Sequence, residues 1–148
     1  MMHLSKITQT KRDENWRNLR DRTMEAHLAA EASHDVDAIM ATFAPDAEVI
    51  VNGQVFSTLE SIRNFHLALG FGGRGALPDL SSPPLRSFVS DEAIVIEYSI
   101  KGTHLGMFDN ISPSGKVVEL PATVIYEFDD EARLQSERAY IDITPLLK

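Results

Sequence analysis

The residues of this chain that could do acid/base chemistry include an aspartate near the end of the sequence. Asp142 closes a strand-like run over residues 133–142, in which it shares a face with Tyr140. If that face lines an apolar pocket, desolvation raises the pKa of Asp142 toward the range in which a carboxyl group can both donate and accept a proton. We therefore predict Asp142 as the catalytic residue. The alternative is an aspartate that caps the turn over residues 143–147.

Three tyrosines are predicted to bind the substrate. Tyr98, Tyr126 and Tyr140 lie on the mainly apolar faces of three strand-like runs that we expect to be neighbours. A buried tyrosine hydroxyl needs a hydrogen-bond partner, and one beside a carbonyl can donate to a developing enolate oxygen. The alternative is that each tyrosine belongs to the core with its hydroxyl at the rim.

Histidines are the other candidates for substrate binding. His104 shares the face of Tyr98 if the strand continues unbroken, and His27 lies on the apolar face of a helical run, as does His66. We include His104 and His27 as binding residues. The alternatives are a structural hydrogen bond for His104, which sits between two glycines, and plain packing for the two helix histidines.

A metal site is not predicted. The sequence has no His-Glu-x-x-His motif, and His66, His104 and Asp109 are scattered along it. The glycine cluster at residues 70–75 follows a helix, whereas a phosphate-binding loop requires a strand before it and a helix after it. We therefore predict no metal and no cofactor.

These residues need elements to position them, and the first 69 residues predict helices. Apolar residues recur at spacings of three and four over residues 13–34, and Ser33 and Asp35 offer N-caps for a second helix over residues 36–43. A capping box at residues 57–60 predicts a third helix that runs to about Leu69.

Strand-like runs with alternating apolar residues dominate the rest of the chain. Helices followed by antiparallel strands are typical of an α+β fold, and no internal repeat or break divides residues 1–148, so we predict a single domain. Residues 70–84 hold four glycines and three prolines, so we expect a loop there. The expected strands cover residues 48–51, 54–56, 85–89, 93–103, 117–128 and 133–142.

The composition excludes several classes of function. The formal net charge of −8 argues against nucleic acid and anionic membranes, since phosphate binding needs clustered lysine and arginine. The absence of cysteine excludes disulfides and thiolate chemistry. No run approaches the roughly 18 apolar residues of a membrane helix, and the first residues lack the apolar core of a secretory signal. We expect a cytoplasmic protein.

Three segments resemble the SnoaL-like polyketide cyclase group of the NTF2-like superfamily. The first is His34–Gly53, a short helix followed by FAPDAEV and a strand. The second is Gly102–Lys116, GTHLGMFDNISPSGK, similar to that group's G-T-H-x-G-x-F…P-T-G-K segment with Ser114 in place of threonine. The third is Leu134–Leu146, similar to a final strand that closes on an aspartate.

The resemblance implies a cone: helices packed in the concave face of a strongly curved, largely antiparallel sheet around an apolar pocket, with dimers formed through the convex face. In the cyclases the aspartate of the final strand is the general acid/base, and Asp142 matches it. These enzymes commonly pair that aspartate with a histidine on the preceding strand, and residues 117–128 contain none.

The implied function is cofactor-independent acid/base catalysis of the cyclase or isomerase kind on a small apolar carbonyl compound. Enolate formation followed by intramolecular aldol attack is the expected mechanism. The alternative is a non-catalytic module that binds a lipophilic ligand or serves in dimerisation. A buried Asp142 open to a cavity favours the enzyme, whereas an Asp142 that caps the last turn in solvent favours the binding module.

Overall fold

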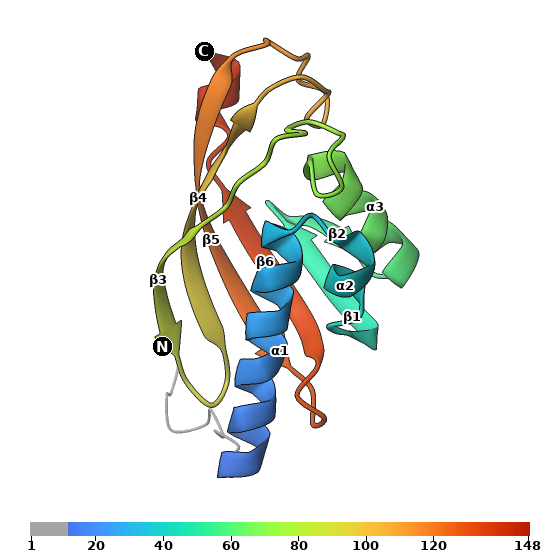
Figure 1. Cartoon of the computed structure of the whole chain (residues 1–148), viewed down its shortest axis with the longest axis vertical. Coiled ribbons are helices and arrows are strands. Elements are labelled where there is room, and N and C mark those ends of the chain that lie inside the picture. The colour runs from blue at the N-terminus through green and yellow to red at the C-terminus, as the bar shows by residue number, and fades with distance from the viewer. Residues whose placement is uncertain (1–11) are drawn as a thin grey trace, which may run out of the picture.

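The computed structural model describes residues 12–148; residues 1–11, which the sequence analysis assigned to the same domain, lie outside the described part. Helices come first and strands dominate the second half, as predicted (Figure 1). In chain order the elements are α1 (Glu14–Ala32), α2 (Val36–Met40), β1 (Phe43–Val51), β2 (Gln54–Phe56), α3 (Leu59–Leu69), β3 (Pro84–Val89), β4 (Ile94–Thr103), β5 (Val117–Phe128), β6 (Leu134–Ile141) and the 3₁₀ helix η2 (Thr144–Leu147).

The six strands form one sheet in the order β2-β1-β6-β5-β4-β3. All neighbours pair antiparallel except β1 and β6, which pair parallel with a register shift between Phe43 and Glu48. The proline at position 45, which has no N–H to donate, lies in that shift. The sheet is curved, and α1 lies across its concave side while α2 and α3 sit over the β1–β2 end (Figure 1). The predicted α+β cone is confirmed.

Each helix begins at a side-chain cap. Asp13 accepts from the Trp16 amide at 2.8 Å, and Asp35 accepts from the Ala38 amide at 3.0 Å, as predicted for that position. The cap of α3 lies one residue later than predicted. Thr58 accepts from the Ser61 amide at 3.1 Å, and the Ser61 hydroxyl in turn accepts from the Thr58 amide. The serine hydroxyl thus replaces the expected glutamate.

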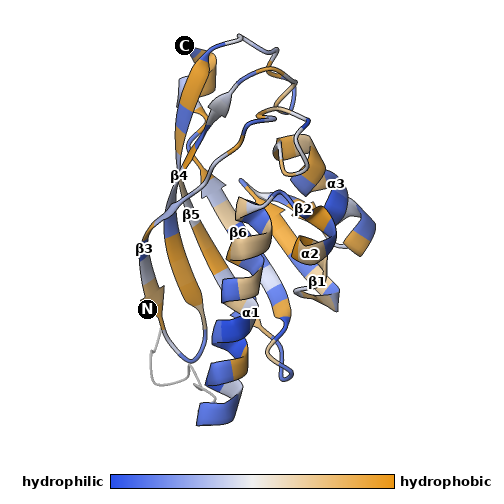
Figure 2. Ribbon diagram, in the orientation of Figure 1, coloured by the Kyte–Doolittle hydropathy of each residue, from blue (hydrophilic) through white to orange (hydrophobic). Residues whose placement is uncertain are grey.

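Alternation along the strands separates a buried face from an outer face. On β4 and β5 the even-numbered residues from Ile94 to Ile100 and from Val118 to Phe128 are buried, which confirms the predicted core faces. Figure 2 shows the hydrophobic strands behind a first half of α1 that is mostly hydrophilic. On β6 the buried residues are Leu134, Glu137, Ala139 and Ile141. No helix within residues 12–148 is both long and apolar enough to cross a membrane.

The loop before β3 is tied to its neighbours by backbone hydrogen bonds. Ser81 and Lys101 exchange two of them, at 2.9 and 2.8 Å. The side chain of His34 contacts the Leu80 carbonyl at 2.7 Å, so its Nε2 donates there. The backbone at residues 80–81 is therefore fixed to β4 on one side and to the α1–α2 turn on the other.

Candidate functional site

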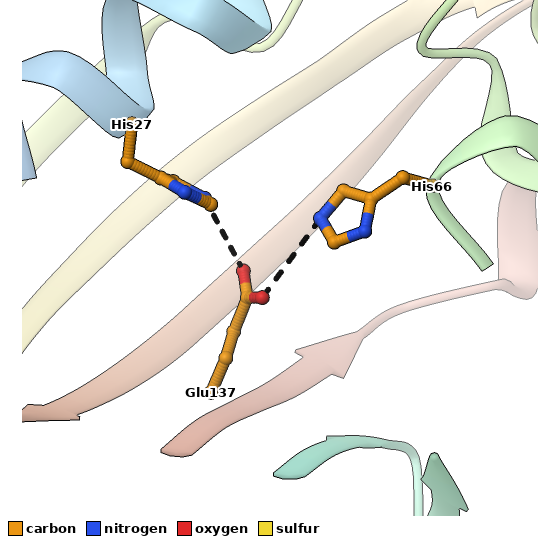
Figure 3. Close-up of side chains that lie close together, drawn as sticks. All are labelled: His27, His66 and Glu137. Atoms are coloured by element: carbon orange, nitrogen blue, oxygen red, sulfur yellow. Dashed lines mark ion pairs between the residues drawn. The ribbon is translucent and has the colours of Figure 1, made fainter. Parts of the chain in front are cut away.

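Two histidines and a glutamate meet inside the cone. His27 lies on the buried face of α1, His66 on the buried face of α3, and Glu137 on the inner face of β6. Figure 3 shows the three side chains pointing toward one another. The Glu137 carboxylate oxygens lie 3.8 Å from His27 Nε2 and 3.9 Å from His66 Nε2. The relative exposure of the three residues is 6% or less, so water does not screen their interaction.

Hydrogen bonds at the far side of each ring fix its tautomer. The Thr42 hydroxyl donates to the Ile39 carbonyl at 2.6 Å, so it accepts from His27 Nδ1 at 2.9 Å. His66 Nδ1 lies 2.8 Å from the Ile62 carbonyl, which can only accept. Both rings thus carry a proton on Nδ1, and both turn Nε2 toward Glu137.

A fourth group, Glu31, completes the cluster from the last turn of α1. Its Oε1 lies 2.9 Å from His27 Nε2, and only 12% of its side chain is exposed. Burial lowers the pKa of His27, but the Glu31 and Glu137 carboxylates more than offset this, so the pKa of His27 is raised. The protonated form of His27 is therefore favoured relative to an imidazole in water.

Glu137 and His66 titrate away from their ordinary ranges. Burial raises the pKa of Glu137 to about 7, despite the opposing effect of His27. Burial also lowers the pKa of His66 to about 4, so this ring is neutral at pH 7. Glu137 Oε2 is buried and has no hydrogen-bond partner among the described residues. A carboxyl group of this kind is suited to proton transfer near neutral pH.

Two of the predicted tyrosines lie beside this cluster. Tyr126 pairs directly with Glu137 across β5 and β6, and its hydroxyl lies 2.6 Å from the hydroxyl of Tyr98. Desolvation by burial raises the pKa of both tyrosines, so both stay protonated. Since one hydroxyl proton forms the bond between them, the other remains to be donated to a ligand oxygen.

A small cavity joins these groups. Glu31, His66, Tyr98, Tyr126 and Glu137 line it together with apolar side chains, and its volume is about 40 Å³. This is room for a few waters or one functional group. Three larger hollows share lining residues with it: a groove of about 390 Å³, an outer pocket of about 340 Å³, and a hollow of about 410 Å³ on the outer face of the sheet, which shares Tyr98 and Ile141. Of the predicted residues, Tyr98 and Tyr126 line the cavity and His27 lies next to it.

The prediction that Asp142 and Tyr140 face an apolar pocket is wrong. Both share a face, as predicted, but it is the outer face of the sheet, where 56% of Tyr140 is exposed. Asp142 is exposed too, and it accepts from the Thr144 amide at 3.0 Å. Hydrogen bonds with the side chain and the amide of Thr144 lower the pKa of Asp142. The alternative geometry is thus found, a cap on η2. The cause is the register of β6, which turns Ala139 and Ile141 inward.

His104 is buried away from the cavity. Its ring Nδ1 lies 3.4 Å from the Ser114 amide, which donates to it, and its backbone N–H and C=O pair with Lys116 and Gly115 across the β4–β5 connection. This arrangement favours the structural alternative for His104, since it holds the two arms of that connection together.

Sequence reasoning missed Glu137 and Glu31 and treated His66 as packing. A signal for Glu137 was present: it shares its strand face with Ala139 and Ile141, and a lone carboxylate on an apolar face demands a partner. Glu31 follows His27 by four residues, the spacing at which helical side chains meet.

The sequence predicts potential metal ligands that are scattered along the chain, but the structure brings three such side chains together. Ligand atoms of His27, His66 and Glu137 all lie within 4.8 Å of one another. Two imidazoles and a carboxylate are ligands that zinc accepts. In the arrangement described, however, the nitrogen that His27 would offer is already paired with Glu31.

Comparison with known proteins places the fold in a family. A protein named as a SnoaL-like polyketide cyclase from a Jannaschia species superposes with a TM-score of 0.77, at 17% identity over 93% of this chain and 95% of that one. The epoxide hydrolase/cyclase-like enzyme SalBIII gives 0.68, at 15% identity over 87% and 95%. An NTF2-like protein of unknown function from Burkholderia pseudomallei gives 0.70, at 15% identity over 88% and 98%.

Identities this low establish a shared fold and nothing finer. No curated protein matches the sequence at a significant level. The family of SnoaL-like domains matches residues 24–134, well over half of the chain. This protein therefore belongs to the family of SnoaL-like domains.

Proposed function

We propose that this protein is a cofactor-independent acid/base enzyme of the polyketide cyclase and isomerase kind, acting on a small, mostly apolar carbonyl compound. The observation that carries the proposal is Glu137. It combines burial, a pKa of about 7 and an unpaired Oε2 with a cavity that two tyrosine hydroxyls also line. These are the parts that proton transfer next to a carbonyl requires.

The proposed reaction begins with the substrate carbonyl oxygen at the Tyr98–Tyr126 pair. Glu137, as a carboxylate, takes a proton from the carbon next to the carbonyl, and the free tyrosine O–H donates to the enolate oxygen that forms. If the substrate has a neighbouring C=C bond, the resulting dienolate can take the proton from Glu137 at its far carbon, which shifts the double bond and is an isomerisation. Otherwise the enolate carbon attacks a second carbonyl within the substrate, which closes a ring. In the second case Glu137 returns its proton to the new alkoxide.

His27, Glu31 and His66 assist without touching the reacting carbon. The His27 imidazolium, paired with Glu31, stabilises the Glu137 carboxylate that acts as base. His66 stays neutral and presents its Nε2 lone pair, which can accept from Glu137 once that group is protonated. The cluster thus favours each protonation state of Glu137 in turn.

A binding module on the same fold is the second candidate. The observation in its favour is Asp142, whose exposed capping position was the expected mark of a non-catalytic protein. Glu137 argues against the binding module, because it supplies a buried acid/base candidate from the strand that precedes Asp142. The cytoplasmic location stays a prediction.

The test compares two carboxylates in one assay: Glu137 on β6 and Asp142, which directly follows that strand. Exchange of the C1 protons of 2-tetralone for deuterium is followed by NMR in buffered D2O with wild type, Glu137→Gln and Asp142→Asn. We expect Glu137→Gln to lower the protein-dependent rate about 10²–10⁴-fold, the usual share of a general base, and Asp142→Asn to leave it nearly unchanged. Addition of EDTA is expected to change nothing, since no proposed step uses a metal.

Two results would contradict the proposal. If wild type gives no exchange above buffer, the binding module becomes the better account. If Asp142→Asn loses the activity while its circular dichroism and melting temperature stay intact, Asp142 is the acid/base, as the sequence first suggested, but it acts on the outer face of the sheet.

A further inference from the structure

The cavity that holds Glu137 is too small to contain a substrate. Its volume of about 40 Å³ lies far below the roughly 300–1,000 Å³ of small-molecule sites. A substrate can therefore place only its reacting group there, and the rest of the molecule needs another site. Three hollows share lining residues with the cavity. The one beside Tyr140 and Asp142 opens on the outer face of the sheet, which leaves the groove and the outer pocket as the two possibilities.

The wall between the cavity and the groove consists of side chains. Phe65 and Leu69 line both spaces. The Phe65 ring lies 5.1 Å from the ring of Phe56 on the groove side and 5.3 Å from the ring of His66 on the cavity side. Phe65 is only half-buried, so its ring can rotate without unfolding the helix that carries it. Leu69 is buried, so the Phe65 ring is the movable part of this wall.

The wall between the cavity and the outer pocket is different. The residues that line both are Glu31, Leu80 and Ser82. The backbone here is held by the paired hydrogen bonds of Ser81 with Lys101 and by His34 at the Leu80 carbonyl. An opening on this side would break backbone hydrogen bonds, which the side-chain wall does not require.

The groove also has the size and chemistry of a ligand site. It measures about 390 Å³, within the range of small-molecule pockets, and is lined by Phe56, Ala68, Met107 and Phe108 among others. Met107 is 53% exposed. The only charged residue that lines the groove is Asp109, and the cavity beyond the groove is lined by two further carboxylates. Such a lining disfavours anions.

We infer that the groove binds the apolar body of a neutral, elongated carbonyl compound, whose oxygen-bearing end passes Phe65 to reach Glu137. This inference rests on the proposed function for the role of Glu137, but the groove and its ligand class are new. It makes Phe65 the residue that controls access, and it predicts that a carboxylate on the ligand prevents binding.

The experiment uses the same new side chain at the two openings. Ala68 faces the groove and Ala32 faces the outer pocket, and both are exposed helix residues, so Ala68→Trp and Ala32→Trp form a matched pair. The probe is neutral 1-phenylbutane-1,3-dione, with anionic 3-oxo-3-phenylpropanoate as its charged counterpart. Affinity is measured by calorimetry, and amide shifts show where the probe binds. Circular dichroism verifies that each variant is folded.

We expect Ala68→Trp to weaken binding of the dione about tenfold or more, and Ala32→Trp to change it less than about twofold. The anion should bind wild type at least about tenfold more weakly than the dione. Amide shifts are expected at Asn64 and Phe108 in the groove and at Ala139 beside Glu137.

Three results would overturn the inference: the opposite ranking of the two tryptophan variants, equal affinity of wild type and Ala68→Trp, or no binding of the dione by wild type. Glu137→Gln separates this inference from the proposed function. If it binds the dione normally but wild type shows no proton exchange on 2-tetralone, the groove stands and the catalytic proposal fails. If exchange is present but Ala68→Trp does not weaken binding, the catalytic proposal stands and the groove fails.

Discussion

At the scale of the single residue, the chemistry depends on where a carboxylate is buried. Asp142 and Glu137 lie on the same segment, five residues apart, and their pKa values move in opposite directions. Hydrogen bonds with the side chain and the amide of Thr144 lower the pKa of Asp142, whereas burial raises the pKa of Glu137. The same functional group is thus a structural cap at one position and a candidate base at the other.

The raised pKa predicts the pH dependence of the reaction. Glu137 is a base only when deprotonated, so a pKa of about 7 in the folded protein shifts the rise in kcat/KM to that pH, well above the ordinary range of a glutamate. We expect the exchange rate to rise about tenfold per pH unit below pH 6 and to level off above pH 8. His66, with a pKa of about 4, adds no inflection there.

The measurement is a pH–rate profile of 2-tetralone exchange between pH 5 and 9. Glu137→Gln should lack the inflection near pH 7 as well as most of the rate. A profile that is flat from pH 5 upward would assign the base to a group that titrates below this range, such as an exposed carboxylate, and remove Glu137 from the mechanism.

What the sequence could and could not reveal is clearest on β6. Alternation predicted a strand and two faces, and the structure confirms both. It could not tell which face points inward, because Tyr140 on one face and Ala139 and Ile141 on the other are all apolar enough for a core. That choice is made by pairing with β5 and with β1, which is distant in sequence. Tyr98 and Tyr126 were placed correctly because their faces are apolar throughout.

At the scale of the element, the β4–β5 connection is positioned by a close backbone contact at Gly106, which leaves no room for a side chain there. A Cβ on Gly106 would lie 2.3 Å from the backbone oxygen of Gly75, and the Leu105 amide donates to the Ala76 carbonyl at 3.0 Å. The same connection carries Met107 and Phe108 into the groove.

We expect Gly106→Ala to lower the free energy of unfolding by about 1–3 kcal/mol, the usual cost of overpacking. The dione should also bind more weakly, because Met107 and Phe108 shift with the backbone. Urea denaturation and calorimetry measure the two effects. Gly115→Ala is the control: its Cβ meets nothing within 4 Å, so it should lose stability only through its positive φ and leave binding unchanged. Normal stability of Gly106→Ala would show that the connection moves freely.

At the scale of the whole molecule, the outer face of the sheet carries exposed apolar side chains. Leu85 is 65% exposed and Tyr140 is 56% exposed, and both line a shallow hollow with Pro121 and Asp142. We propose that two copies of the chain pair through this face, which agrees with the homodimer expected from the sequence. The hollow lies on the other side of the sheet from the cavity, so pairing leaves the groove open.

Sedimentation equilibrium tests this proposal. Wild type is expected to sediment as a dimer of about 33 kDa, twice the mass of the 16.5 kDa chain, and Tyr140→Glu as a monomer, since a buried unpaired charge at an interface is costly. Met107→Glu, which adds the same charge to the groove, should leave the dimer intact. A wild-type monomer at micromolar concentration would contradict the proposal.

The place of β6 in the sheet has a consequence for how the protein is made. The last strand of the sequence lies between β1 and β5 and joins the first part of the sheet to the rest, over a separation of about ninety residues. During synthesis, β1 has no partner on that side until the last strand leaves the ribosome. Long-range pairing of this kind slows folding. Glu137 arrives with that strand, so the cluster of His27, His66 and Glu137 can assemble only after β6 has been synthesised.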